Sequence, residues 1–121
     1  MVEEVGEQRH HAIGAVDEAS SALGINGDAS DNSAPSAGAV YIMRQGPSSW
    51  SQEAFIKASN TEAGDDYGHA VALTADGNLV LAGASLECAS STGVNGNQLN
   101  NDEPESGAAY LWRRVGSVWG Q

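Results

Sequence analysis

An internal repeat constrains this sequence more than any other feature. A gapless offset of 69 positions superimposes residues 38–41 on residues 107–110 and aligns Trp50 with Trp119. A fixed period of this kind is typical of solenoids and propellers, in which each unit buries its apolar face against the next unit. We therefore expect two copies of one structural unit, amounting to fewer than two complete repeats.

The pattern within each copy predicts strands and no helix. Residues 38–44 and 50–58 are rich in small, β-branched and aromatic side chains, which predicts a hairpin. Residues 67–74 and 79–84 are largely apolar and flank an Asp-Gly pair, which predicts a second hairpin with a tight turn. The predicted fold class is therefore all-β, with antiparallel four-stranded blades of an incomplete β-propeller, about two blades in all.

The domain boundaries follow from the same offset. Residues 12–58 are assigned to a partial first blade, and residues 59–121 to a second blade whose last strand is truncated. Residues 1–11 are expected to be divergent or disordered, because the polar His10 and His11 align with apolar residues of the second copy.

Two polar segments, residues 17–37 and residues 86–106, make each repeat longer than a minimal blade. Insertions of this composition are expected on the surface, where binding usually takes place. We interpret their oxygen-bearing side chains as solvated binding loops; the alternative is weak cation binding, in which Asp28, Asp31 and Asp102 would be ligands. The residues assigned to the binding loops are Asn26, Asp28, Asp31, Asn32, Asn95, Asn97, Asn101 and Asp102.

The charge balance restricts the possible partners. The chain carries 16 acidic and 5 basic residues, a net charge of −11, which repels phosphate backbones and anionic lipid headgroups. Its apolar runs are much shorter than the roughly 20 residues of a membrane helix. We therefore expect no nucleic-acid partner and no membrane insertion. The single cysteine, Cys88, is interpreted as a buried thiol without a disulfide partner in the chain.

Several short motifs occur in a fixed order. Tyr67-Gly68 is followed by Gly83-Ala84-Ser85, and this pair of motifs resembles the Phe-Gly and Gly-Ala-Pro motifs for which FG-GAP repeats are named. The chain is most similar to the long bacterial-type version of this integrin-alpha-like family. The further motifs that carry the resemblance lie at residues 37–41, 50–52, 57–61 and 93–96.

The resemblance implies a propeller segment of a secreted or cell-surface protein. It also implies a non-catalytic role in cell adhesion or protein binding, with neighbouring blades of a longer chain as further partners. Residues 1–9 lack the apolar centre of a secretory signal, so signal-dependent export would have to be directed from elsewhere.

The integrin-type repeat implies a calcium site, which this sequence retains only in part. That site is an Asp-x-Asp-x-Asp-Gly loop between the two named motifs, and its oxygen atoms supply most of the six to eight calcium ligands. This chain has only Asp76 and Asn78 there, around a glycine. We therefore expect a plain turn and no cofactor, with calcium binding at the degenerate loop as the alternative.

No pattern in the sequence predicts catalysis. Glu62, Asp65 and Asp66 form a short acidic run between the two blades, which we interpret as a solvated turn and not as paired catalytic carboxylates. The histidines do not have the spacing of a metal site. The chain is accordingly predicted not to be an enzyme, although an active site assembled from several blades is a third alternative.

The equivalent tryptophans Trp50 and Trp119 are expected to pack between blades. Exposed, they would instead stack on sugar rings, and a lectin-like propeller is therefore the second functional hypothesis. Glycines at equivalent positions are expected to let neighbouring sheets or loops approach closely. These glycines are Gly14, Gly38, Gly83 and Gly107.

Overall fold

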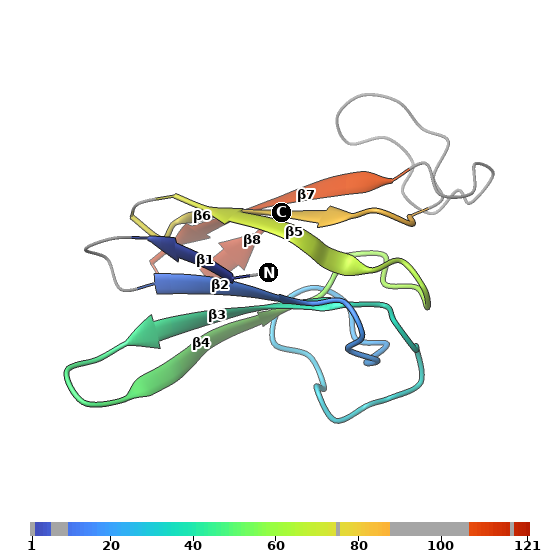
Figure 1. The fold of residues 1–121 in the computed structure, drawn as a ribbon, viewed down its shortest axis with the longest axis horizontal. Helices are drawn as coiled ribbons and strands as arrows, with labels where there is room; N and C mark the ends of the chain where they lie inside the picture. Colours follow the sequence, from blue (N-terminus) through green and yellow to red (C-terminus); the bar gives the residue numbers. More distant parts are fainter. Residues whose placement is uncertain (1, 6–9, 75, 88–106, 117) are drawn as a thin grey trace.

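The protein folds into two antiparallel four-stranded sheets that lie one against the other (Figure 1). This arrangement was obtained as a computed structural model, which describes residues 2–5, 10–74, 76–87, 107–116 and 118–121. The described residues form no helix, and among them there is accordingly no apolar helix of a length that could cross a membrane. The all-β prediction is confirmed.

The first sheet contains four strands in sequence order, namely β1 (Val2–Val5), β2 (His10–Ala15), β3 (Ala39–Gln45) and β4 (Trp50–Ile56). The predicted hairpin is β3 and β4. Our expectation for residues 1–11 was wrong in part, because β1 pairs with β2 and both His10 and His11 are buried within β2. The first sheet therefore begins earlier than the sequence indicated.

The second sheet repeats the same order with β5 (Tyr67–Leu73), β6 (Leu79–Ala84), β7 (Ala108–Val115) and β8 (Val118–Gly120). Its last strand, β8, has 3 residues, whereas β4 has 7. Strand register follows the offset of 69 positions: Ala12 pairs with Ile42, and Leu81 pairs with Leu111. Tyr41 and Tyr110 consequently occupy the same place on β3 and β7.

One hydrophobic core lies between the two sheets. Val40, Ile42 and Ile56 of the first sheet are fully buried and belong to one cluster with apolar residues of the second sheet. Burial of each such side chain contributes roughly 1.5–3 kcal/mol. The residues that the second sheet contributes are Tyr67, Val71, Leu73, Val80, Ala82, Ala84, Tyr110, Trp112 and Trp119.

Two glycines of the first repeat allow the sheets to approach closely, as predicted. A Cβ atom at Gly14 would lie 2.0 Å from the carbonyl oxygen of Gly68, and one at Gly38 would lie 2.0 Å from that of Tyr67. The equivalent Gly83 and Gly107 do not meet such neighbours among the described residues, where the nearest atoms are 3.7 and 3.5 Å away. For these two residues the expectation of a close approach does not hold within the described chain.

The long segment between β2 and β3 is partly integrated into the fold. It lies at the same end of the molecule as the segment that joins β4 to β5 (Figure 1), and the Gly64 amide donates a hydrogen bond to the Pro35 carbonyl over 2.9 Å. Ile25 forms an isolated bridge with Ile56, and Ala37 is buried. This segment thus helps to position the residues described next.

Candidate functional site

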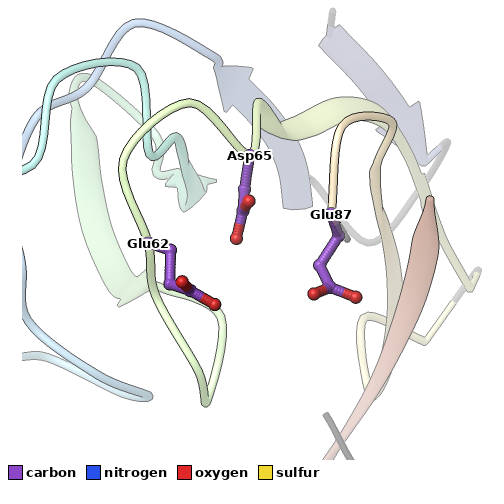
Figure 2. A group of neighbouring side chains, drawn as sticks. All are labelled: Glu62, Asp65 and Glu87. Carbon is purple, nitrogen blue, oxygen red and sulfur yellow. The ribbon is translucent and has the colours of Figure 1, made fainter. Parts of the chain in front are cut away.

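Three carboxylates from two separate segments converge at one end of the second sheet, before the start of β5 and after the end of β6 (Figure 2). Glu62 and Asp65 belong to the segment between β4 and β5, and Glu87 follows the end of β6. One carboxylate oxygen from each residue lies within 4.8 Å of the other two. We call Glu62, Asp65 and Glu87 the acidic cluster.

Backbone hydrogen bonds hold the acidic cluster together. The Asp65 amide donates to the Glu62 carbonyl over 3.4 Å, and the Leu86 amide donates to the Asp65 carbonyl over 3.3 Å. The carbonyl of Glu87 accepts a hydrogen bond of 2.7 Å from the Gly107 amide at the start of β7. The two segments are therefore tied to each other and to the sheet.

Two of the three residues of the acidic cluster, Asp65 and Glu87, are buried, so our interpretation of the acidic run as a solvated turn was wrong for Asp65. Asp65 is 5 % exposed and Glu87 is 1 % exposed. The Oδ2 atom of Asp65 is buried and has no hydrogen-bond partner among the residues that the structure describes. Burial first, and then the neighbouring charges of Glu62 and Glu87, raise the pKa of Asp65 to about 7. Asp65 therefore changes its charge near neutral pH.

A second buried polar group is formed by Lys57 and Glu18 of the first repeat. Lys57 is fully buried, and its Nζ atom donates to the Gly38 carbonyl over 2.5 Å and lies 3.5 Å from the Glu18 Oε1 atom. Burial lowers the pKa of Lys57, and the carboxylate of Glu18 opposes that shift. This ion pair joins the end of β4 to the long loop after β2.

The acidic cluster is suited to binding a positive charge. Carboxylates at this spacing can ligate a hard cation or accept hydrogen bonds from an ammonium group. Tyr110 lies nearby, and its hydroxyl donates a hydrogen bond to the Oδ1 atom of Asn60. Burial, followed by the charge of Glu87, raises the pKa of Tyr110, so this hydroxyl stays protonated.

Glu87 was not among the predicted site residues. The repeat contains a signal for it, because the offset of 69 positions aligns Glu87 with a second glutamate, Glu18. The burial of Asp65 had no sequence signal, since it depends on how the segment before β5 meets the loop after β6.

The residues at the place of the integrin-type calcium loop form a turn. In this turn the two candidate ligands, Asp76 and Asn78, form hydrogen bonds with other groups of the protein. The Oδ1 atom of Asp76 accepts hydrogen bonds from the Thr74 hydroxyl over 2.7 Å and from the Asn78 amide over 3.0 Å. The side-chain oxygen of Asn78 accepts a hydrogen bond of 3.1 Å from Arg114. The tight turn between β5 and β6 is therefore present, and calcium binding there stays an alternative prediction.

The described binding-loop residues do not converge on one site. The side-chain oxygen of Asn26 accepts a hydrogen bond of 2.8 Å from the Phe55 amide, and Asp28 accepts one of 2.9 Å from the Ser30 amide. Hydrogen bonds from Ser21, and then from Ser33, lower the pKa of Asp31 to about 2. Asn32 lies on the same loop. The remaining candidates lie outside the described residues: Asn95, Asn97, Asn101 and Asp102. Cys88, predicted to be a buried thiol, also lies outside them.

The two equivalent tryptophans have different surroundings. Trp119 is buried, and the guanidinium of Arg114 lies 5.7 Å from the centre of its ring. Trp50 is 52 % exposed and contacts the His11 ring edge-on, at 4.5 Å between ring centres. The expectation of packing between the sheets therefore holds for Trp119 and was wrong for Trp50.

Three residues of the named motifs, Tyr67, Gly68 and Ala84, lie at the contact between the sheets. Tyr67 is fully buried, and its hydroxyl accepts a hydrogen bond of 2.9 Å from the Trp112 indole. Gly68 has a φ of 90°, which favours glycine, and Ala84 is buried. Gly83 lies on β6, and Ser85 follows the end of that strand.

The histidines do not gather into one site. In β2, His10 points to one side of the sheet, where its Nε2 atom lies 3.1 Å from the Glu53 Oε2 atom, and His11 points to the other side toward Trp50. This placement follows from the alternation of side chains along a strand. His69 is exposed on β5.

Comparison with known proteins identifies the repeat. A family model described as FG-GAP repeat matches residues 50–112, which is just over half of the 121 residues. No curated protein matches the chain significantly, and no solved structure does so. The matched region runs from the start of β4 to within β7 and includes the acidic cluster together with the named motifs. The chain therefore belongs to the FG-GAP repeat family.

Proposed function

We propose that this chain is a non-catalytic segment of a secreted or cell-surface β-propeller that binds a protein partner and mediates adhesion. In this proposal the two sheets are adjacent blades. A further blade of the same type covers the face of the second blade that carries Leu81 and Leu111, which we call the open face. The long loop after β2 supplies the surface that contacts the partner. The match to the FG-GAP repeat supports a β-propeller-type repeat region, and the pair of four-stranded antiparallel sheets supports it too.

The observation that carries the propeller part of this proposal is a difference between equivalent residues. Ala12 and Ile42 of the first blade are fully buried against the second blade. Their equivalents Leu81 and Leu111 point away from the shared core and are 45 % and 54 % exposed. A repeat protein buries each such face under the next unit, which supports a further blade as the occupant.

Gly83 supports the same occupant independently. Its equivalent in the first blade, Gly14, must be glycine because the Gly68 carbonyl of the next blade takes the space of a Cβ atom. Gly83 meets no such neighbour among the described residues, and its φ lies outside the range that favours glycine. A glycine at this position is explained if another blade approaches β6 as the second blade approaches β2.

A lectin-like propeller is the second candidate function. Trp50 supports it, because this indole is half-exposed and is fixed by an edge contact with His11. Aromatic rings of this kind can stack on sugar rings. Screening the chain on a glycan array, with the Trp50→Ala variant as a control, separates this candidate from protein binding.

Sedimentation of the full chain tests whether the open face is an interface, because it measures the mass of the associated species. We expect the chain to self-associate through Leu81 and Leu111 in place of the missing blade, because an apolar face of this kind is seldom left in contact with water. The double variant Leu81→Gln/Leu111→Gln should shift the sedimenting mass toward the 12.4 kDa of the monomer.

The double variant Val115→Gln/Val118→Gln is the matched control. These two valines are 71 % and 69 % exposed on the same sheet, but they align with Gly46 and Ser49, which lie outside the buried face of the first blade. The control should associate as the wild type does. A wild-type chain that sediments as a monomer at every concentration, or equal effects of the two double variants, would contradict the proposal.

A further inference from the structure

The long loop after β2 crosses the outer edge of β4. In the first sheet β4 is the last strand in order, so its outer edge is the side that faces away from β3. On that side Ile25 forms an antiparallel bridge with Ile56, and the Lys57 amide donates a hydrogen bond of 2.8 Å to the Gly24 carbonyl. We call residues 24–26 the guard segment.

Asn26 of the guard segment satisfies both backbone groups of one β4 residue. Its amide donates a hydrogen bond of 2.7 Å to the Phe55 carbonyl, and its side-chain Oδ1 atom accepts one of 2.8 Å from the Phe55 amide. Two residues of an antiparallel ladder that exchange both hydrogen bonds make the same pair of contacts. Asn26 therefore occupies Phe55 as a residue of a neighbouring strand would.

Left-handed backbone conformations keep the guard segment short. The φ angle is 68° at Gly24 and 55° at Asn26, in a region that glycine adopts freely and that asparagine tolerates better than most residues. An extended strand cannot continue through such residues, so the loop leaves the edge on both sides of Ile25. The sequence repeats this requirement, because the offset of 69 positions aligns residues 24–27 with residues 93–96, which again read Gly-x-Asn-Gly.

Without the guard segment, β4 would present an open edge. Residues 50–58 contain neither proline nor glycine, and unpaired N–H and C=O groups of such a strand are a template for pairing with another chain. A second copy of β4 fits this edge. Two β4 strands placed antiparallel about Phe55 would exchange the two hydrogen bonds that Asn26 now makes, and a two-fold contact of this kind is self-complementary.

We propose that the guard segment is a strap that closes the outer edge of β4 against strand addition by a second copy of this chain. Displacement of the strap exposes the Phe55 N–H and C=O groups together with the Lys57 N–H group. The exposed edge then pairs antiparallel with the same edge of another molecule. This inference goes beyond the proposed function, since it concerns the edge of β4 and neither the open face nor the partner of the loop.

Amide hydrogen exchange of the full chain measures whether the strap covers the edge. Asn26→Pro removes the donor amide, the Oδ1 acceptor and the left-handed φ together, because proline has no N–H and fixes φ near −65°. We expect the Phe55 and Lys57 amides to exchange at least about tenfold faster than in the parent chain at low concentration. The Ala54 and Ile56 amides should keep their protection, since successive N–H groups along a strand point to opposite sides and these two face β3.

The dependence on concentration tests the occupant. All variants are made in the Leu81→Gln/Leu111→Gln chain, so that association through the open face does not contribute. When the concentration of Asn26→Pro is raised from about 10 µM to about 500 µM, the Phe55 and Lys57 amides should regain protection, because pairing follows mass action. The sedimenting mass should rise in parallel toward a dimer of the 12.4 kDa chain. The parent chain should show neither change.

Two further variants separate the strap from the rest of the loop. Asn26→Gly keeps the amide and permits the left-handed φ, but it removes the Oδ1 acceptor. It should therefore expose the Phe55 amide and leave protected the Lys57 amide, which donates to the Gly24 carbonyl. This variant keeps the test decisive if Asn26→Pro fails to fold. Asn32→Gly, the matched substitution elsewhere on the same loop, should change neither amide.

Three results would overturn the inference. Unchanged exchange of the Phe55 amide in Asn26→Gly would show that the strap does not hold the edge. Faster exchange in Asn26→Pro with a monomeric mass at every concentration would show that the uncovered edge does not pair with a second copy. Equal association of Asn32→Gly would show that the effect is not specific to the strap. If the parent chain itself associates, the open-face proposal fails, whereas the exchange of each variant relative to the parent still decides whether the strap covers β4.

Discussion

Asp65 makes the stability of the chain depend on pH. Its pKa rises from the ordinary 3.8 to about 7 on folding, because burial and then the charges of Glu62 and Glu87 disfavour its ionised form. The folded state therefore binds a proton that the unfolded state has lost. The corresponding stability is fully present below about pH 4 and is lost as the pH rises through about 7.

The Asp65→Asn variant removes this dependence. We expect it to be more stable than the wild type at about pH 8, by on the order of 2–4 kcal/mol, and close to the wild type at about pH 4. Urea unfolding at the two pH values measures the difference, and Asp66→Asn serves as the control. A difference in stability between the wild type and Asp65→Asn that is the same at both pH values would rule out a raised pKa.

The repeat predicts the backbone contacts of some residues, but it does not predict how exposed their side chains are. Glu18 and Glu87 occupy equivalent positions in the sequence, and the structure gives them equivalent backbone contacts. The different exposure of Trp50 and Trp119 could not be predicted, because it depends on which face of each sheet another sheet covers. The burial of Asp65 likewise arises from contacts between segments far apart in the sequence.

At the scale of the strands, equivalent glycines should respond differently to the same substitution. At Gly14 a Cβ atom would lie 2.0 Å from the backbone oxygen of Gly68, so alanine must push β2 away from β5. At Gly83 the nearest atom is 3.7 Å away, which is ordinary van der Waals contact. We expect Gly14→Ala to cost about 2–3 kcal/mol and Gly83→Ala to be neutral or to stabilise by up to about 1 kcal/mol.

Thermal unfolding of the two variants measures this difference, and the pair forms its own control because both substitutions add one methyl group to the same position of a repeat. Equal losses for the two variants would show that alanine is disfavoured in the strand itself and not by the neighbouring sheet. In a longer chain that carries a further blade, we expect Gly83→Ala to become as costly as Gly14→Ala.

The strands from β3 to β8 could be predicted because apolar runs, an Asp-Gly turn and the repeat agreed on their positions. β1 could not, since Val2–Val5 is too short and too acidic to indicate a strand, and only its pairing with β2 defines it. The loop after β2 was expected to be a surface insertion that binds a partner. Its bridge to Ile56 and the pairing of Glu18 with Lys57 make it part of the blade.

In the part of the molecule that the structure describes, the two sheets share one core. Most of their buried apolar residues form a single cluster, and the Arg114 Nη1 atom of the second sheet lies 2.5 Å from the Glu53 Oε1 atom of the first. Repeat units that share an interface in this way stabilise each other. The offset in the sequence predicted this stacking, but it did not indicate which face would be buried.

The two sheets should therefore unfold together when their shared core is weakened. Ile42 is fully buried in the first sheet, so Ile42→Ala should cost about 2–5 kcal/mol. Its equivalent Leu111 is 54 % exposed, and Leu111→Ala should change the stability of the monomer by less than about 0.5 kcal/mol. Hydrogen exchange should show that Ile42→Ala lowers the protection of β6 amides as much as that of β2 amides. Retained protection of β6 beside a loss in β2 would mean that the sheets are independent and that the core between them does not hold the fold together.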